Sequence, residues 1–354
     1  MTPAHLLLLF FATASFTELS QQAAAAREGG RVKDAIRLYR ASLQARPAWS
    51  QGWWYLGTLL YDENSFTAGR EALTRLVKLE PKAAPGWEML GLCEFETKDY
   101  ANSLIHLERG LAIGQNGDPQ LAKVTRFHAA MLLTLFGQYE SAIQRFTELA
   151  TSGGDDPQII PAIGLAALRV PILPANTPPG KSELVSAAGR AVYDAALRRA
   201  ADARKDFENL AATYPDTPEV HNLYGMFLLQ SDPDRAIAEW KREIEISPKH
   251  VPARLQLAFE YLKRNEAATG LPYARQAAEL ELDSFVAHNA LGRLLGETGD
   301  QKGAIVELER ARDLAVDSPE TRLALASAYA AAGRTQDAAR ERAEFQRLKS
   351  LSAH

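Results

Sequence analysis

The chain is poor in the features that mark several common classes of protein. Cys93 is the one cysteine among 354 residues, so no disulfide can form within the chain, and this fits either redox compartment. Neither sign of charge dominates, because 40 basic residues are balanced by 44 acidic ones. Since nucleic-acid binding usually needs a basic stripe, we expect no nucleic-acid partner.

Long apolar runs are also scarce. The run at residues 6–11 is too short to cross a bilayer, which takes about 20 apolar residues, so we expect no integral membrane span. The Ala-Thr-Ala sequence at residues 12–14 is typical of a signal cleavage site. We therefore expect residues 1–14 to be a secretory signal and the protein to be exported, to the periplasm in a bacterium. Because no Lys or Arg precedes the run, a cytoplasmic protein is the alternative.

Motifs of catalysis and metal binding are missing as well. The chain has no G-x-S-x-G elbow, no G-x4-G-K-[ST] loop and no H-E-x-x-H sequence. None of the 7 histidines forms a ligand pair at helical spacing. Glu94 and Glu96 are two residues apart and would point to different sides of a helix. We therefore expect no enzyme, no cofactor and no metal.

The sequence does contain a repeat, because the same residue types recur every 34 residues through most of the chain. The residues that keep this step include Pro47 and Pro81, Trp53 and Trp87, Gly57 and Gly91, and the series Ala258, Gly292 and Ala326. A fixed period in this range is typical of a stack of supersecondary units rather than of one globular core.

One unit can be followed from residue 50 to residue 81. Trp53, Gly57 and Leu60 are spaced to share one face of a helix, and a polar turn follows at residues 62–64. A second helical stretch carries Gly69 and ends at Pro81, which lacks a backbone donor. Because Gly costs about 1 kcal/mol inside a helix, the recurring glycines indicate positions where two helices pack closely.

This arrangement resembles the tetratricopeptide repeat, whose pattern is W-x2-L-G-x2-Y in the first helix and A-x3-F-x2-A with a closing Pro in the second. The resemblance implies an all-α fold, a right-handed superhelical solenoid of antiparallel helix pairs. A generic bundle of alanine-rich helices is the alternative, but it has no reason to repeat Gly and Pro at one step. His221 and His288 occupy the Trp position of their units, so we expect them to be packing residues.

The step fails between residues 153 and 181, where Gly and Pro cluster. We therefore expect a block of about four repeats at 15–152, an irregular insert with one short helix at 153–181, and about five repeats at 182–354 that end in a polar capping helix. The insert is either a plain connection or a segment that docks on a neighbouring helix or in the groove. Val170, Ile172 and Leu173 favour docking, because they are apolar and need burial.

In the resembled family, the first helix of each pair lines a concave groove, with groove positions one, five and eight residues after the Trp position. The candidates carried onto this chain are Trp54, Tyr61, Phe95, Phe127, Met131, Asn222, Phe259, Asn289 and Arg293, and the same rule includes Leu262 and Gly296. The alternative for each side chain is packing against the next repeat.

These positions predict a scaffold that binds a peptide or a partner helix in the groove. The partner is expected to be a protein. A non-catalytic regulatory or assembly subunit of a cell-envelope enzyme or export complex is the alternative function. The Lys and Asn clamp by which some members of the family grip a C-terminal carboxylate is not reproduced, so we do not expect a chaperone-tail adaptor.

Overall fold

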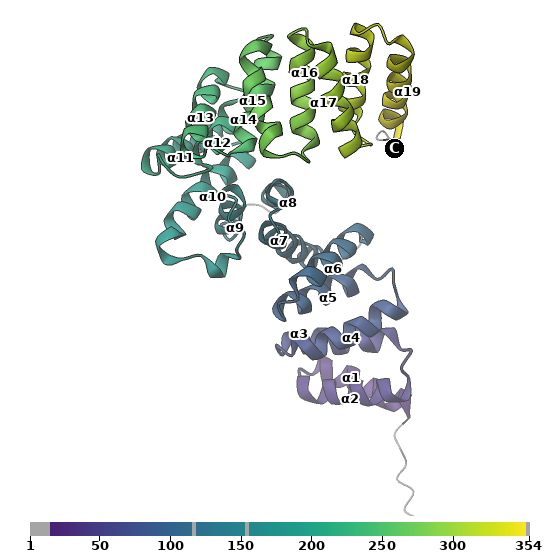
Figure 1. The fold of residues 1–354 in the computed structure, drawn as a ribbon. Helices are drawn as coiled ribbons and strands as arrows, with labels where there is room; N and C mark the ends of the chain where they lie inside the picture. Colours follow the sequence, from purple (N-terminus) through teal and green to yellow (C-terminus); the bar gives the residue numbers. More distant parts are fainter. Residues whose placement is uncertain (1–14, 115–117, 153–155, 352–354) are drawn as a thin grey trace, which may run out of the picture. The chain divides into compact units, whose positions relative to one another are not determined.

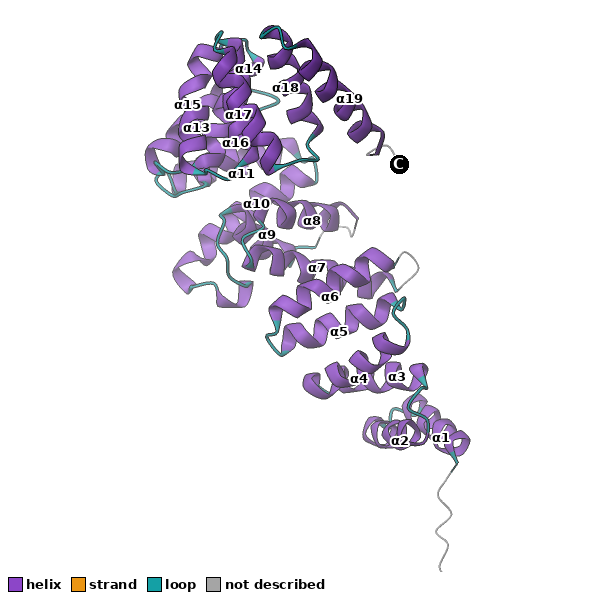
Figure 2. Ribbon diagram, turned by 45° about the vertical axis from the view of Figure 1, so that its right-hand side comes forward, coloured by secondary structure: helices purple, strands orange, loops and turns teal. Residues whose placement is uncertain are grey.

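All the regular structure in the described part of the chain is helical (Figures 1 and 2). The structure is a computed structural model that describes residues 15–114, 118–152 and 156–351. Within these residues it contains nineteen α-helices and two 3₁₀ helices. This confirms the prediction of an all-α solenoid. The candidate signal at residues 1–14 lies outside the described residues.

The chain divides into two compact units, unit 1 at Met1–Ser182 and unit 2 at Glu183–His354. Unit 1 contains four packed helix pairs followed by a short helix. Its α-helices are α1 (Phe16–Glu28), α2 (Val32–Ala45), α3 (Ser50–Asp62), α4 (Phe66–Leu79), α5 (Ala84–Glu96), α6 (Tyr100–Ile113), α7 (Pro119–Leu135), α8 (Tyr139–Ser152) and α9 (Ile159–Ala167). The 3₁₀ helices η1 (Pro174–Asn176) and η2 (Pro179–Lys181) come next.

In unit 2, the helices α12 to α19 form four further packed pairs. Its helices are α10 (Ser182–Ala196), which begins at the boundary, α11 (Ala200–Thr213), α12 (Val220–Leu228), α13 (Pro233–Ile246), α14 (Val251–Lys263), α15 (Ala267–Leu280), α16 (Phe285–Glu297), α17 (Gln301–Leu314), α18 (Pro319–Ala331) and α19 (Thr335–Leu351). None of the helices in the described ranges combines the length and the apolar character that crossing a bilayer requires.

The turns inside the helix pairs keep the step of the repeat. A left-handed backbone conformation recurs every 34 residues at Gly30, Asn64 and Lys98, and again at Asn265, Gly299 and Gly333. Gly and Asn adopt this conformation readily, whereas it strains a residue such as Lys98, whose φ is 62°. The backbone of the turn is therefore fixed by the repeat even where the residue does not favour it.

The Trp position of each repeat is defined by a hydrogen bond to a backbone carbonyl six residues earlier. Trp53 Nε1 donates to the Pro47 oxygen at 2.8 Å, and Trp87 Nε1 donates to the Pro81 oxygen at 2.9 Å. Four other side chains donate from the same position, namely His221 to Pro215 (2.9 Å), Arg254 to Pro248 (2.6 Å), His288 to Leu282 (3.0 Å) and Arg322 to Val316 (3.0 Å). Trp, His and Arg are interchangeable here because each supplies an N–H donor.

Both histidines at this position are buried, which confirms that they are packing residues. The second ring nitrogen of His221, Nδ1, faces the Glu239 carboxylate, and Nδ1 of His288 faces Glu307. Each ring of His221 and His288 therefore faces an oxygen acceptor at both nitrogens. The hydrogen bond to Glu239 raises the pKa of His221, against the opposing effect of burial.

The segment after α8 packs inside unit 1. Helix α9 contacts α7 and α8, and η1 contacts α9. Leu173, directly before η1, is buried, whereas Val170 and Ile172 are half-buried. The proline-rich segment thus lies against α9, the short helix that precedes it, and α9 packs on the last helix pair of unit 1.

Candidate protein-binding groove

A groove of about 490 Å³ lies on α17 and on the first helices of the last three pairs of unit 2. Leu262 of α14, Arg293 of α16, and Leu323 and Ser327 of α18 contribute to its lining. Arg293 is exposed, and Leu323 retains 47 % of its accessible surface although it is apolar. An exposed leucine and an exposed arginine in one groove suit a partner, because the leucine offers apolar area and arginine is enriched at interfaces.

Gly296 opens this groove, and packing between helices does not require a glycine there. A Cβ atom added to Gly296 would have as its nearest neighbours Ala304 Cβ at 3.7 Å and Gln301 Oε1 at 3.9 Å, which are ordinary contact distances. Four residues earlier, a Cβ on Gly292 would lie 2.6 Å from Leu308 Cγ and 3.0 Å from the Ala304 carbonyl oxygen. Gly292 is therefore a packing glycine, whereas Gly296 leaves space that a partner can occupy.

The groove combines an apolar lining with both signs of charge. Ala324 and Ala328 add apolar surface, while Glu297 and Glu320 are exposed carboxylates that line the groove with Arg293. Such a surface matches an amphipathic segment better than a purely apolar one, because each charge can pair at the rim while the apolar side chains are covered.

The aromatic candidates of unit 1 are largely engaged with neighbouring repeats. Trp54, Tyr61 and Phe95 are half-buried against the core around Trp87 and Leu107. The Phe95 ring lies edge-on to His128 of the next pair, with 4.6 Å between centroids. Trp54 keeps one open side, because it lines a cleft of about 510 Å³ between α3 and the start of α5.

Phe127 is also shared between packing and an open surface. Its ring lies edge-on to Phe146 of α8 at 6.0 Å, yet it lines a second cleft of about 410 Å³ together with His128 and Lys123. Burial lowers the pKa of His128, so this imidazole is neutral near pH 7.

Three other candidates are buried, which leaves little of them for a partner. Met131 packs inside unit 1. Asn222 donates to Glu219 at 3.0 Å, and Asn289 donates to Thr321 Oγ1 of the next repeat at 3.0 Å. The Asn222 amide thus serves a contact within its own repeat, and the Asn289 amide serves a contact with the next one. Phe259 is half-buried against the core of unit 2.

The groove residues of α18 are not among the positions predicted from the sequence. Leu323 and Ser327 follow Asn289 and Arg293 by one step of 34 residues, so the same rule carried one repeat further would have found them. Glu320 has no counterpart in the rule, and its place in the groove follows from the start of α18 beside α16.

The single cysteine, Cys93, has a structural role. Burial raises the pKa of the Cys93 thiol to about 12, and nearby carboxylates add to this effect, so the thiol is protonated and inert near pH 7. This confirms the sequence-based interpretation of a buried structural cysteine. In the ranges that the structure describes, no three His, Cys, Asp or Glu side chains are grouped to hold a metal ion.

The fold defines a helical-repeat protein. Its helix pairs recur at a fixed step, the turns within the pairs share one backbone conformation, and side chains of unit 2 line a groove. The tetratricopeptide-repeat family model matches residues 56–118 and 187–250. The chain thus contains tetratricopeptide repeats in these two regions, and its helical solenoid is that of a scaffold for protein–protein interaction. Folds of this kind are generally non-catalytic, and the absence of enzyme activity in this chain stays a prediction.

Several solved structures are similar to part of the chain. A crystal structure of MamA protein is 15 % identical, with a TM-score of 0.44, and covers 49 % of this chain and 95 % of its own. MamA from Desulfovibrio magneticus RS-1 is 19 % identical, with a TM-score of 0.41, over 45 % of this chain and 91 % of its own. At these scores the likeness carries no argument about function. No curated protein matches the sequence significantly.

Proposed function

We propose that the protein is a scaffold that holds an amphipathic helix or an extended peptide of a protein partner in the groove of unit 2. The observation that supports this most is the space at Gly296, which the packing of α16 on α17 does not require. The equivalent position carries Tyr61 and Phe95 in unit 1 and Leu262 one repeat earlier. The fold therefore tolerates a side chain at this position, and the absence of one at Gly296 in α16 opens the groove.

The chemistry of the groove indicates the kind of segment it binds. Leu323 and Leu262 would cover an apolar side chain, while Arg293 would pair with a carboxylate of the partner and Glu320 with a cation. A segment with apolar residues on one side and mixed charge on the other satisfies all of these groups. Rim pairs of this kind contribute orientation more than affinity.

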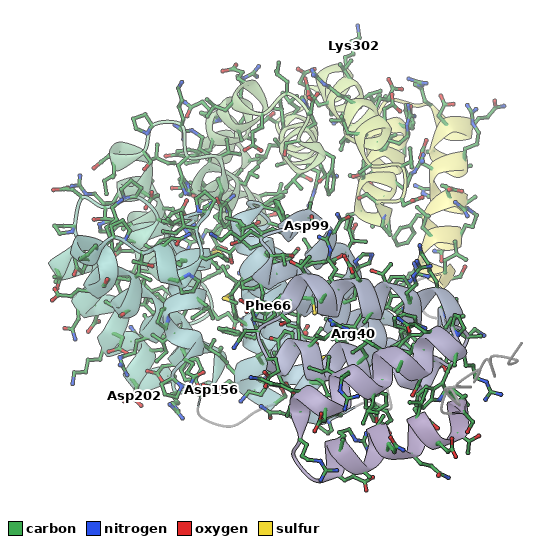
Figure 3. The ribbon with its side chains drawn as sticks, turned by 90° about the horizontal axis from the view of Figure 1, so that it is seen from below. Arg40, Phe66, Asp99, Asp156, Asp202 and Lys302 are labelled. Carbon is green, nitrogen blue, oxygen red and sulfur yellow. The ribbon has the colours of Figure 1, made fainter. Side chains whose placement is uncertain are left out.

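Site-specific photo-cross-linking tests the proposal. Benzoylphenylalanine is placed at Ser327 in the groove, and at Lys302 as a control, because Lys302 points away from the helices into solvent (Figure 3). In cells that express the protein naturally, we expect a discrete adduct from position 327, none from position 302, and loss of the adduct in a Gly296→Phe background. Equal adducts from both positions, or an adduct that survives Gly296→Phe, would contradict groove binding.

We also propose that the protein is exported, on the basis of the apolar run and the Ala-Thr-Ala sequence at residues 6–14. Residues 1–20 fused to alkaline phosphatase, which is active only after export, should give phosphatase activity. Activity equal to that of a leaderless fusion would favour the cytoplasmic alternative.

A further inference from the structure

A second concave surface lies in unit 1, among the helices α2, α3 and α4. It is a cleft of about 700 Å³. Trp53, Leu43 and Leu56 supply apolar surface to its lining, and Arg40, Arg75 and Lys78 supply three cations. It shares no lining residue with the groove of unit 2, so the two sites can be tested separately.

The indole of Trp53 is open to this cleft, whereas the equivalent Trp87 is covered. One repeat further on, the Arg109 guanidinium lies 4.0 Å from the Trp87 ring centroid, and the His106 ring lies 5.1 Å from it. A step of 34 residues back from His106 and Arg109 gives Ala72 and Arg75. Ala72 is too short to cover the indole, and no described cation stacks on Trp53, which is half-buried where Trp87 is buried. In the next repeat, the space that corresponds to this cleft is filled by His106 and Arg109.

The three cations of the cleft have no partner in the described part of the chain. Arg40, Arg75 and Lys78 are exposed and take part in no described ion pair, and the lining contains no carboxylate. Cations near the end of a helix can be stabilised by the helix dipole alone. That explanation fits only Lys78, because Arg40 and Arg75 lie before the last turns of α2 and α4.

We propose that this cleft binds an acidic segment of a partner protein that inserts an aromatic or large aliphatic side chain over Trp53. The indole face supplies stacking or apolar contact, which adds to the area that the inserted side chain buries. The cations supply charge complementarity around it. A flat bilayer surface does not reach a recessed indole, and a duplex nucleic acid contacts a longer basic stripe than three residues.

A defined peptide probe tests this. Fluorescein-labelled EDEFED is titrated with the intact protein at low salt, and binding is followed by fluorescence anisotropy. The test variant carries Arg40→Gln, Arg75→Gln and Lys78→Gln. The matched control carries Lys249→Gln, Lys302→Gln and Arg342→Gln, which removes the same number of exposed positive charges from unit 2. Circular dichroism and thermal melting confirm that both variants fold.

We expect binding to the wild type and to the control, and a loss of at least about tenfold in the test variant. The probe EDEGED should also bind at least about tenfold more weakly, because it lacks the inserted ring. Three results would overturn the proposal. These are equal binding by test and control variants, equal binding of EDEGED, and tighter cleft-dependent binding of phosphatidylglycerol vesicles or of a 20-base oligonucleotide than of any acidic peptide.

Discussion

Two glycines four residues apart in α16 should respond in opposite ways to the same substitution. In Gly296→Ala the new methyl group has no neighbour closer than 3.7 Å, so the change adds helix propensity without a clash. Since Gly costs about 0.5–1 kcal/mol relative to Ala inside a helix, and Gly296 lies in the last turn, we expect a gain of about 0.5 kcal/mol.

In Gly292→Ala the methyl group would lie 2.6 Å from Leu308 Cγ and 3.0 Å from a backbone oxygen. Either α17 moves away or Leu308 leaves its rotamer, and overpacking of this kind costs about 1–3 kcal/mol. The two variants should therefore differ by about 1.5–3.5 kcal/mol in the free energy of unfolding.

Urea unfolding of the intact chain measures this difference, and hydrogen exchange of α16 to α18 reports on unit 2 alone. In melting temperature, about 2–4 °C per kcal/mol is expected for a unit of this size. A destabilised Gly296→Ala would refute the reasoning, because Gly296 would then serve packing and not the groove. A Gly292→Ala variant as stable as the wild type would refute the packing role of the first glycine.

Three further predictions concern the solenoid itself. The hydrogen bond to Glu239 raises the pKa of His221, so the stability that this pair contributes is complete below the ordinary histidine pKa and is lost as pH rises through the raised value. Urea unfolding between pH 5 and 9 should show this fall in stability, and Glu239→Gln should flatten the pH dependence. Lys98→Gly should raise stability by about 1 kcal/mol, since the left-handed turn strains a residue with a side chain, and a decrease in thermal melting temperature would contradict this. Cys93 is buried with a thiol pKa near 12, so it should resist maleimide at pH 7 until urea unfolds unit 1, and rapid labelling of the native protein would argue against its burial.

The fold could be predicted from the sequence because packing constraints recur at a fixed step. Trp53 and Trp87 repeat one hydrogen bond, and a Cβ on Gly57 or Gly91 would strike Leu73 or Leu107 in the same way. Each such constraint is local to one helix pair, so it appears as a residue type at a regular spacing.

The candidate groove could be predicted only in part, since a position in the repeat does not tell whether a side chain is free. Asn222 and Asn289 stand at groove positions, but their amides are used by Glu219 and Thr321. Gly292 and Gly296 look alike in the sequence, and only their distances from α17 separate a packing glycine from an open one. The cleft over Trp53 could not be predicted from the repeat pattern, because its signal is the small size of Ala72 where the next repeat has His106.

The measurement that tests the central claim most directly is the affinity of a groove-selected peptide. A displayed peptide library is selected on the wild-type protein with counter-selection on Gly296→Phe, a change that refills the groove as Tyr61 and Phe95 do at the equivalent positions. Isothermal titration then compares the best peptide on the two proteins and on the Lys302→Ala control. We predict that Gly296→Phe weakens binding at least about tenfold, or by about 1.4 kcal/mol, while Lys302→Ala leaves it unchanged. A library that yields no peptide, or a peptide that binds Gly296→Phe as tightly as the wild type, would contradict binding in this groove.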